Sequence, residues 1–394
     1  MTTTTNSQAP AAGGRPPLVT RPLLLRFVSV IGASASFYLL LSVVPLYARA
    51  SGGGNAAGPA TGALMLATVV GELATPRFVT RFGYRRTLVA GLVLLGAPAL
   101  VLTASGGTVW IVAVCLVRGL GFALTIVAGG ALTAALIPAE RRGEGLALVG
   151  VVSGVPSLVA LPLGVWLVAH VGYAPVAVVA AVAALAAIVA VPGLPDREPV
   201  SGRPVGVVAG LRTPDLARPA AVFGATALAA GIIVTFLPLA VPSTSVGVVA
   251  SALFVQPAAA TAARWAAGRY GDRHGPSGLV LPGLLVAAAG VLLVALTGSP
   301  TAVVAGVALF GTGFGAAQNA TLSLMYARVP SSGYGTVSAL WNFAYDAGMG
   351  VGAVGFGALA GRTGYPLAFA LTAVAMLTAI VPARRDRRHG HATP

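Results

Sequence analysis

Long apolar runs alternate along the chain with short segments that hold most of the charged residues. The runs are about 20 residues long, the length that an α-helix needs to cross the hydrocarbon core of a membrane. The pattern predicts twelve membrane-spanning helices, at 24–47, 60–79, 87–104, 108–135, 145–169, 174–191, 219–240, 246–267, 278–297, 301–325, 335–360 and 366–382. A transmembrane barrel would instead show strands of about ten residues with alternating apolar positions, and the sequence has no such alternation.

The composition excludes a soluble protein. The 394 residues are 57% hydrophobic and only 8% charged, and the mean hydropathy is +0.90. In a soluble domain, roughly a quarter of the residues are charged. Because a backbone in lipid must satisfy its hydrogen bonds within itself, we expect an all-α membrane protein.

The charges predict the orientation of the chain. All 24 basic residues are arginines. With a cytoplasmic N-terminus, Arg49 and Arg362 fall in outward loops, Arg118 falls within a predicted helix, and the other 21 lie on the cytoplasmic side. This bias predicts a multi-pass protein of the cell inner (cytoplasmic) membrane with both termini cytoplasmic. The net charge of +15 is divided among short loops, where it suits anionic lipid headgroups and not nucleic acid.

The same pattern divides the chain into five parts. We expect a disordered cytoplasmic N-terminal tail at 1–22, a six-helix bundle at 23–191, a cytoplasmic linker at 192–218, a second six-helix bundle at 219–382 and a basic cytoplasmic tail at 383–394. Cys115 is the only cysteine, so the chain cannot form an internal disulfide.

The second half of the sequence repeats the first at a constant shift of 192 residues. At this shift Arg77, Arg81, Gly83, Pro138, Gly143, Gly172 and Tyr173 coincide with Arg269, Arg273, Gly275, Pro330, Gly335, Gly364 and Tyr365. Since each copy holds an even number of crossings, both copies face the same way. Such parallel repeats enclose a binding site at their interface.

The loop between the second and third helix of each half resembles the signature loop of the major facilitator superfamily. That signature is a glycine, three residues, Asp, a basic residue, one residue and a glycine. The second half matches it with Gly268, Asp272, Arg273 and Gly275. The first half keeps Arg81, Gly83, Arg85 and Arg86 but has Pro76 and Thr80 in place of the glycine and the aspartate.

The resemblance extends from about residue 20 to 382, and Arg118, Gly119 and Gly121 are similar to the family's arginine motif in the fourth helix. It implies alternating access of a central cavity to the two sides, in a monomer that moves a small molecule. It also implies a cytoplasmic gate that latches one access state, and Thr80 would leave that latch to the second half. The gate residues would be Asp272, Arg273, Gly268, Gly275, Arg264, Arg81, Gly83 and Arg85. The alternative is that these charges only fix the topology.

Three ionisable residues within the predicted helices stand out, because charges there are costly and usually functional. Asp346 is the leading candidate for carrying a proton, because a carboxyl group can change its charge, and the alternative is a packing role. Glu72 is a second carboxyl candidate. Arg118 keeps its charge at any relevant pH, so it serves a substrate or an anion, or it pairs permanently with Glu72.

Further polar and aromatic residues are expected around the cavity. Asn342 lies one helical turn from Asp346, and Trp341 and Tyr345 form a neighbouring pair that would give the cavity an aromatic wall. Gln318 and Asn319 are amides deep in an apolar run, where they bind substrate or join helices. Phe37, Tyr38, Phe236 and Gln256 are weaker candidates. The cavity is expected to be apolar and mostly uncharged.

The sequence therefore predicts a secondary transporter, not an enzyme, with no cofactor and with the proton gradient as the energy source. The chain has no lysine, so it has no phosphate-binding loop for ATP, and its four histidines have no metal-site spacing. Residues 150–164 resemble the glycine–proline motif of family exporters, with Pro162 and Gly164 present but the spacing broken. Export of a small, partly apolar molecule is the leading prediction. Uptake of a nutrient and a sensor that moves nothing are the alternatives.

Overall fold

A computed structural model describes residues 19–51, 56–137, 142–196, 210–242, 246–329 and 334–389. Residues 1–18 of the expected N-terminal tail and residues 197–209 of the expected linker lie outside these ranges. The described residues form an all-helical bundle, which confirms the predicted fold class. Each predicted apolar run falls on helical residues, with ends shifted by a few positions.

The N-terminal half contains five long helices. They are α1 (Arg21–Ala50), α2 (Ala57–Leu100), α3 (Thr108–Leu136), α4 (Arg142–Val171) and α5 (Tyr173–Ala186), with the short helices η1 (Leu102–Ala104) and η3 (Ala187–Gly193). The C-terminal half contains α7 (Pro214–Ala240), α8 (Val246–His274), α9 (Ser277–Val294), α10 (Pro300–Ala327), α11 (Tyr334–Thr363), α12 (Tyr365–Met376), η6 (Leu377–Ala379) and α13 (Ile380–His389).

Helix α2 supplies two of the predicted crossings because the chain reverses at Gly83. This glycine has φ 78° and ψ 171°, which breaks the helix. Gly71 before the break faces Ala123, and Gly91 after it faces Thr125, so both arms lie against the same part of α3. Ten helical segments of the described chain are long and apolar enough to cross a membrane, and the segment that contains this reversal is one of them.

The backbone reproduces the sequence repeat. The described glycines with positive φ are Gly83, Gly172, Gly275 and Gly364, which are two pairs at the shift of 192 residues. The bounds of α4 and α11 differ by the same shift at both ends. A positive φ is easily adopted only by glycine, so these positions fix the same turns in both halves.

The repeat extends to the packing of helices. A Cβ atom built on Gly121 would lie 2.4 Å from the backbone nitrogen of Leu95, and one built on Gly313 would lie 2.2 Å from that of Ala287. These are the same contact in the two halves. Small residues at such positions let membrane helices approach closely.

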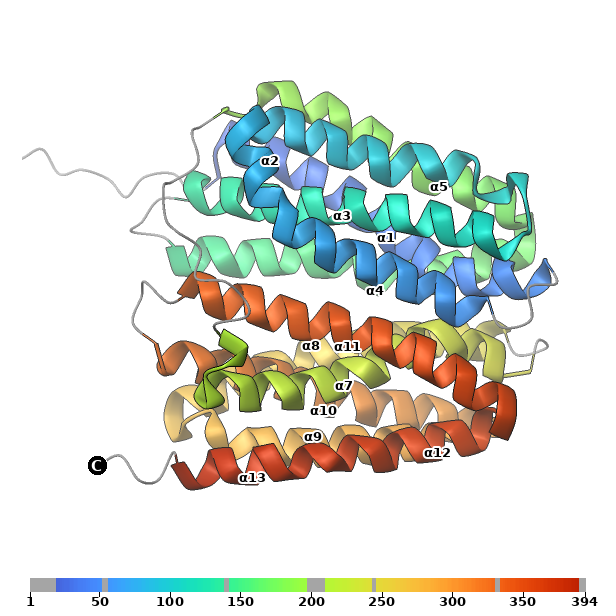
Figure 1. Cartoon of the computed structure of the whole chain (residues 1–394), viewed down its shortest axis with the longest axis vertical. Helices are drawn as coiled ribbons and strands as arrows, with labels where there is room; N and C mark the ends of the chain where they lie inside the picture. Colours follow the sequence, from blue (N-terminus) through green and yellow to red (C-terminus); the bar gives the residue numbers. More distant parts are fainter. Residues whose placement is uncertain are drawn as a thin grey trace, which may run out of the picture.

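The bundle has two ends, which we name by their residues (Figure 1). The Gly83 end carries the turns at Gly83 and Gly275 and the helix α13, and the Arg49 end carries Arg49 and the turn at Gly364. The two halves lie one above the other in this view.

Two predicted boundaries differ from the helices in the structure. Helix α7 begins at Pro214, before the apolar run at 219, because a proline is well suited to the first helical position. The expected C-terminal tail is helical as far as His389.

Candidate functional site

The two halves are joined at the Arg49 end. Arg49 Nη1 donates to the carbonyl oxygen of Leu239 at 2.9 Å and to the hydroxyl of Tyr365 at 3.0 Å. Deeper in the bundle, the hydroxyl of Thr235 on α7 donates to that of Thr61 on α2 at 3.1 Å. These contacts tie α1 and α2 to the C-terminal half and close this end.

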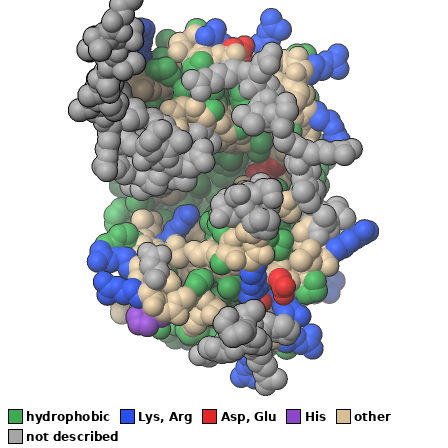
Figure 2. Space-filling view, turned by 90° about the vertical axis from the view of Figure 1, so that its left-hand side faces the viewer, with side chains coloured by type: hydrophobic (Ala, Val, Ile, Leu, Met, Phe, Trp, Pro, Cys, Tyr) green, Lys and Arg blue, Asp and Glu red, His purple; other side chains and the backbone are tan. Residues whose placement is uncertain are grey.

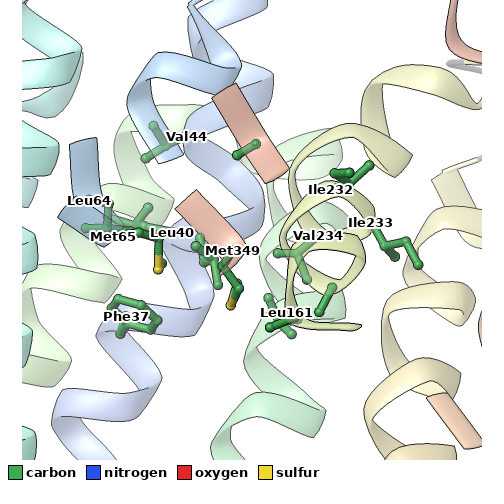
Figure 3. Packing of buried hydrophobic residues seen from close by; sticks show 14 of the residues in the cluster. Phe37, Leu40, Val44, Leu64, Met65, Leu161, Ile232, Ile233, Val234 and Met349 are labelled. Atoms are coloured by element: carbon green, nitrogen blue, oxygen red, sulfur yellow. The ribbon is translucent and has the colours of Figure 1, made fainter. Parts of the chain in front are cut away.

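An apolar layer lies below these contacts. Met349 of α11 stands between Leu40 and Met65 of the N-terminal half and Val234 of the C-terminal half (Figure 3). Backbones approach closely here, since a Cβ on Gly58 would lie 2.6 Å from the carbonyl oxygen of Ala353. The layer seals the centre of the bundle from the Arg49 end.

The Gly83 end is hollowed between the halves (Figure 2). A cavity of about 340 Å³ lies between them, lined by residues of α1, α4, α7, α8, α10 and α11. Its polar lining residues are Tyr38, Ser153, Ser157, Gln256, Thr261, Arg264, Gln318 and Tyr345. Arg264 is exposed to this space, and it is the charged side chain among the described lining residues.

The cavity is mostly uncharged, as expected, but it carries more polar side chains than an apolar cavity would. The amides of Gln256 and Gln318 both donate and accept hydrogen bonds, the hydroxyls do the same, and Arg264 only donates. Tyr38 and Gln256, which the sequence offers only as weaker candidates, both line this cavity. The other two weak candidates, Phe37 and Phe236, are buried in the apolar core.

Two carboxyl groups meet where the halves touch. The side chains of Glu72 on α2 and Asp346 on α11 are within hydrogen-bonding reach of each other. The hydroxyl groups of Tyr38 and Tyr345 lie near Asp346. The sequence singled out both carboxyl residues but not their pairing, because α2 and α11 are far apart in the chain.

The repeat relates this carboxyl pair to the cavity wall. Glu72 coincides with Arg264 at the shift of 192 residues, and Asp346 coincides with Gly154. Both Arg264 and Gly154 line the central cavity, and a Cβ on Gly154 would have no atom within 4 Å. One copy of the interface is thus filled by two carboxyl groups, and the other leaves an arginine facing open space.

Arg118 lies outside the cavity, so its expected place in a substrate site is corrected. Its side chain is 0% exposed inside the N-terminal half. Nε donates to the carbonyl oxygen of Leu95 at 3.1 Å, and Nη2 donates to that of Ser36 at 2.9 Å. The expected alternative partner, Glu72, contacts Asp346 instead. The repeat places Phe310, also fully buried, at the equivalent position.

The other expected cavity residues divide into two groups. Gln318 and Tyr345 line the cavity. Trp341, Asn319 and Asn342 are half-buried and are not among its described lining residues. Trp341 stacks on Phe223 with ring centroids 4.3 Å apart, so it packs within the C-terminal half. Asn319 faces Gly268 of α8, which is a contact between helices.

At the Gly83 turn, the expected gate residues bind within their own half. Arg85 donates from its backbone nitrogen to Asp196 at 3.3 Å and from Nε to the carbonyl oxygen of Leu194. Arg81 lies over the ring of Phe82, at 5.3 Å from its centroid. The sequence missed Asp196, which supplies a carboxylate to this turn.

At the equivalent turn of the second half, Gly275 has φ 81° and Gly268 is half-buried on α8. Arg273 is exposed, and the side chain of Asp272 lies outside the described part of the structure. A latch made by Asp272 stays a prediction.

Arg26 of α1 is a buried arginine that the sequence did not single out. It donates to the carbonyl oxygens of Gly129 and Thr125 on α3, at 3.1 and 3.3 Å. Like Arg118 it is stabilised by backbone carbonyls within one half. The described residues contain no group of three His, Cys, Asp or Glu side chains that would hold a metal ion.

Comparisons with known proteins agree with this architecture. The family profile of the Major Facilitator Superfamily matches residues 26–353 and 220–394. No curated protein matches the sequence.

Solved structures share the fold at low sequence identity. A point mutant of the nucleoside transporter NupG has a TM-score of 0.73 and 13% identity, and the match covers 93% of this chain and 99% of that one. NupG itself has a TM-score of 0.72, 12% identity and coverages of 95% and 100%.

A bacterial homologue of the human lysosomal transporter Spinster, in an inward-facing and unoccupied conformation, has a TM-score of 0.73 and 13% identity, covering 93% of this chain and 96% of that one. The family profile, the repeat and the cavity between the halves lead to one assignment. The chain belongs to the major facilitator superfamily and is a membrane transporter of small molecules.

Proposed function

We propose that the protein is a proton-coupled exporter of a small molecule in the inner membrane, with both termini and the Gly83 end facing the cytoplasm. The observation that carries the proposal is the meeting of Glu72 and Asp346 between the two halves. Asp346 is only 7% exposed, so water does little to screen the two groups from each other.

The pair links protonation to the shape of the molecule. Two ionised carboxylates at hydrogen-bonding distance repel each other, so at least one carries a proton when they meet. The proton then holds α2 against α11, and its loss places two like charges across that contact. Protonation therefore favours the conformation closed at the Arg49 end, and deprotonation favours its opening.

The arginines support the proposed orientation. Arg77, Arg81, Arg85, Arg269 and Arg273 all lie toward the Gly83 end, where anionic headgroups of the cytoplasmic leaflet would hold them. With this orientation, the hollow at the Gly83 end opens the present conformation to the cytoplasm (Figure 2).

The substrate would bind in the central cavity from the cytoplasmic side. Arg264 would donate to an acceptor group of the substrate, and Gln256 and Gln318 would fix its orientation. The cavity lies within one chain, so a monomer would suffice.

We also expect Asp272→Asn to reduce transport without affecting insertion, because it removes the charge of the proposed latch. Normal transport by a well-expressed variant would contradict that latch.

Reconstitution into proteoliposomes with an imposed pH gradient tests the proposal. A panel of labelled small solutes and a pH-sensitive dye inside the vesicles would report solute and proton movement together. We expect exchange of one solute against protons in the wild type. Asp346→Asn and Glu72→Gln should abolish accumulation driven by the gradient. Asp215→Asn, which removes an exposed acidic group at the start of α7, is the matched control and should transport normally.

The outcomes separate the alternatives. Solute and protons that move in the same direction would make the protein an uptake transporter. Saturable binding without any flux would make it a sensor. Full accumulation by Asp346→Asn would refute the role of the carboxyl pair.

A further inference from the structure

A second space reaches Asp346 from the side of the bundle. It is a groove of about 650 Å³ between α2, α3 and α11, distinct from the central cavity. Its wall contains Leu66, Val69, Leu116, Phe343 and Val351, and Asp346 is the one polar side chain among its described lining residues. Leu66 and Val351 are 61% and 64% exposed on the outer surface, so the groove opens toward lipid.

The charges in this groove are unbalanced. Glu72 and Asp346 face each other, the hydroxyl groups of Tyr38 and Tyr345 lie near Asp346, and no salt bridge among the described residues reaches either carboxyl group. None of these is a cation. Arg264 acts on Tyr345 but lies on the cavity side of α11. The groove ends at Asp346, with Glu72 beside that residue and no basic partner among the described contacts of the pair. Such a groove is complementary to an apolar molecule that ends in a cation.

We propose that this groove binds a lipophilic amine dissolved in the bilayer, with its apolar chain between α2 and α11 and its ammonium group on the carboxylates of Asp346 and Glu72. The ammonium takes the place of the shared proton, so amine and proton compete for the pair. A bound amine would therefore uncouple or replace proton movement. That consequence rests on the proposed proton coupling, whereas the binding itself does not.

An apolar groove elsewhere in the bundle provides an internal control. A second lateral groove of about 460 Å³ lies between α1, α4 and α5, with Ile31, Val155, Val159 and Leu163 in its wall and no polar side chain among its described lining residues. Both grooves would hold an acyl chain. Only the groove at Asp346 offers a partner for an amine.

The test is equilibrium binding by the full-length protein in nanodiscs of uncharged phosphatidylcholine, without any gradient. The probes are dodecylamine with a terminal nitroxide and the corresponding labelled alcohol, and the immobilised fraction is measured by electron paramagnetic resonance. We expect the amine to bind at least about tenfold more tightly than the alcohol, and Asp346→Asn to remove that preference. Binding of the amine should weaken as the pH is lowered, because protonation removes the charge of the carboxylates.

Two lipid-facing substitutions control for folding and location. Val351→Trp fills the groove at Asp346 and should reduce amine binding by about tenfold, equivalent to about 1.4 kcal/mol. Val159→Trp fills the second groove and should leave amine binding unchanged. Equal binding of amine and alcohol, or unchanged amine binding in Asp346→Asn, would overturn the proposal and leave the groove as a lipid contact.

This outcome is separate from the outcome of the transport experiment. Amine binding that depends on Asp346 in a protein that shows no proton-coupled flux would keep the site and refute the coupling. Proton-coupled flux without any preference for the amine over the alcohol would keep the coupling and refute the amine site.

Discussion

The two interfaces that the repeat relates are built from equivalent helices but differ in character. At the interface of α2 with α11, Glu72 and Asp346 meet and fill the contact. At the interface of α8 with α4, the equivalent residues are Arg264 and Gly154, and both line an open cavity. The duplicated backbone therefore sets where the two halves can touch. A few polar side chains decide which of the two interfaces is closed.

The largest expected effect comes from making the second interface resemble the first. In Gly154→Asp, the new carboxylate should pair with Arg264 across the cavity, because a Cβ at this position meets no atom within 4 Å. A charge-assisted pair is stronger than a hydrogen bond between neutral groups, and this one would cross the space that the solute would occupy. We expect solute binding and transport to be nearly lost, as measured by equilibrium binding in detergent and by flux in proteoliposomes.

Gly154→Ala is the matched control, since it adds the Cβ without the charge and should retain transport. If Gly154→Asp transported as well as Gly154→Ala, Arg264 would not be free for a partner in the cavity.

A smaller effect is expected from substitutions inside each half, where Arg118 and Phe310 occupy equivalent positions of the repeat. Both side chains are 0% exposed, so Phe310→Ala and Arg118→Ala should each lower the free energy of unfolding by about 3 kcal/mol through the space they leave. Arg118→Met should cost less, because methionine fills the space and removes a buried charge that has no carboxylate beside it among its described contacts. Chemical unfolding in micelles would measure the three values.

Transport by Arg118→Met separates a stabilising role of this arginine from a role in the substrate pathway. A stabilising role predicts normal flux in this variant. Loss of flux in a protein with unchanged stability would return Arg118 to the substrate pathway.

The smallest effect is expected where the closed interface continues toward the Arg49 end. Thr235→Val removes the hydrogen bond to Thr61 with little change of shape. Hydrogen bonds between membrane helices contribute about 0.6 kcal/mol, so the ratio of the two access states should shift by about threefold toward opening at the Arg49 end. Distance measurements between spin labels on α1 and α7 would detect the shift, and an unchanged distribution would show that the apolar layer alone closes this end.

Much of the fold follows from local sequence features. Apolar runs of the right length give the helices, and glycines at fixed positions give the turns, since each depends on residues close together in the chain. The same reasoning found Asp346, Glu72 and Gln318, because a polar side chain in an apolar run is conspicuous by itself. It missed Asp196 and Arg26, whose partners lie about 110 and 100 residues away.

The sequence by itself determined that this chain crosses a membrane as helices and that its two halves repeat, and it singled out Asp346, Glu72 and Arg118 within the apolar runs. These properties depend on composition, length and spacing. Only the tertiary structure decided that Glu72 meets Asp346, that Arg118 binds backbone carbonyls within one half, and that Arg264 faces the cavity. Which side chains meet depends on how α2, α4, α8 and α11 are rotated against one another, and that rotation is set by packing across the whole bundle.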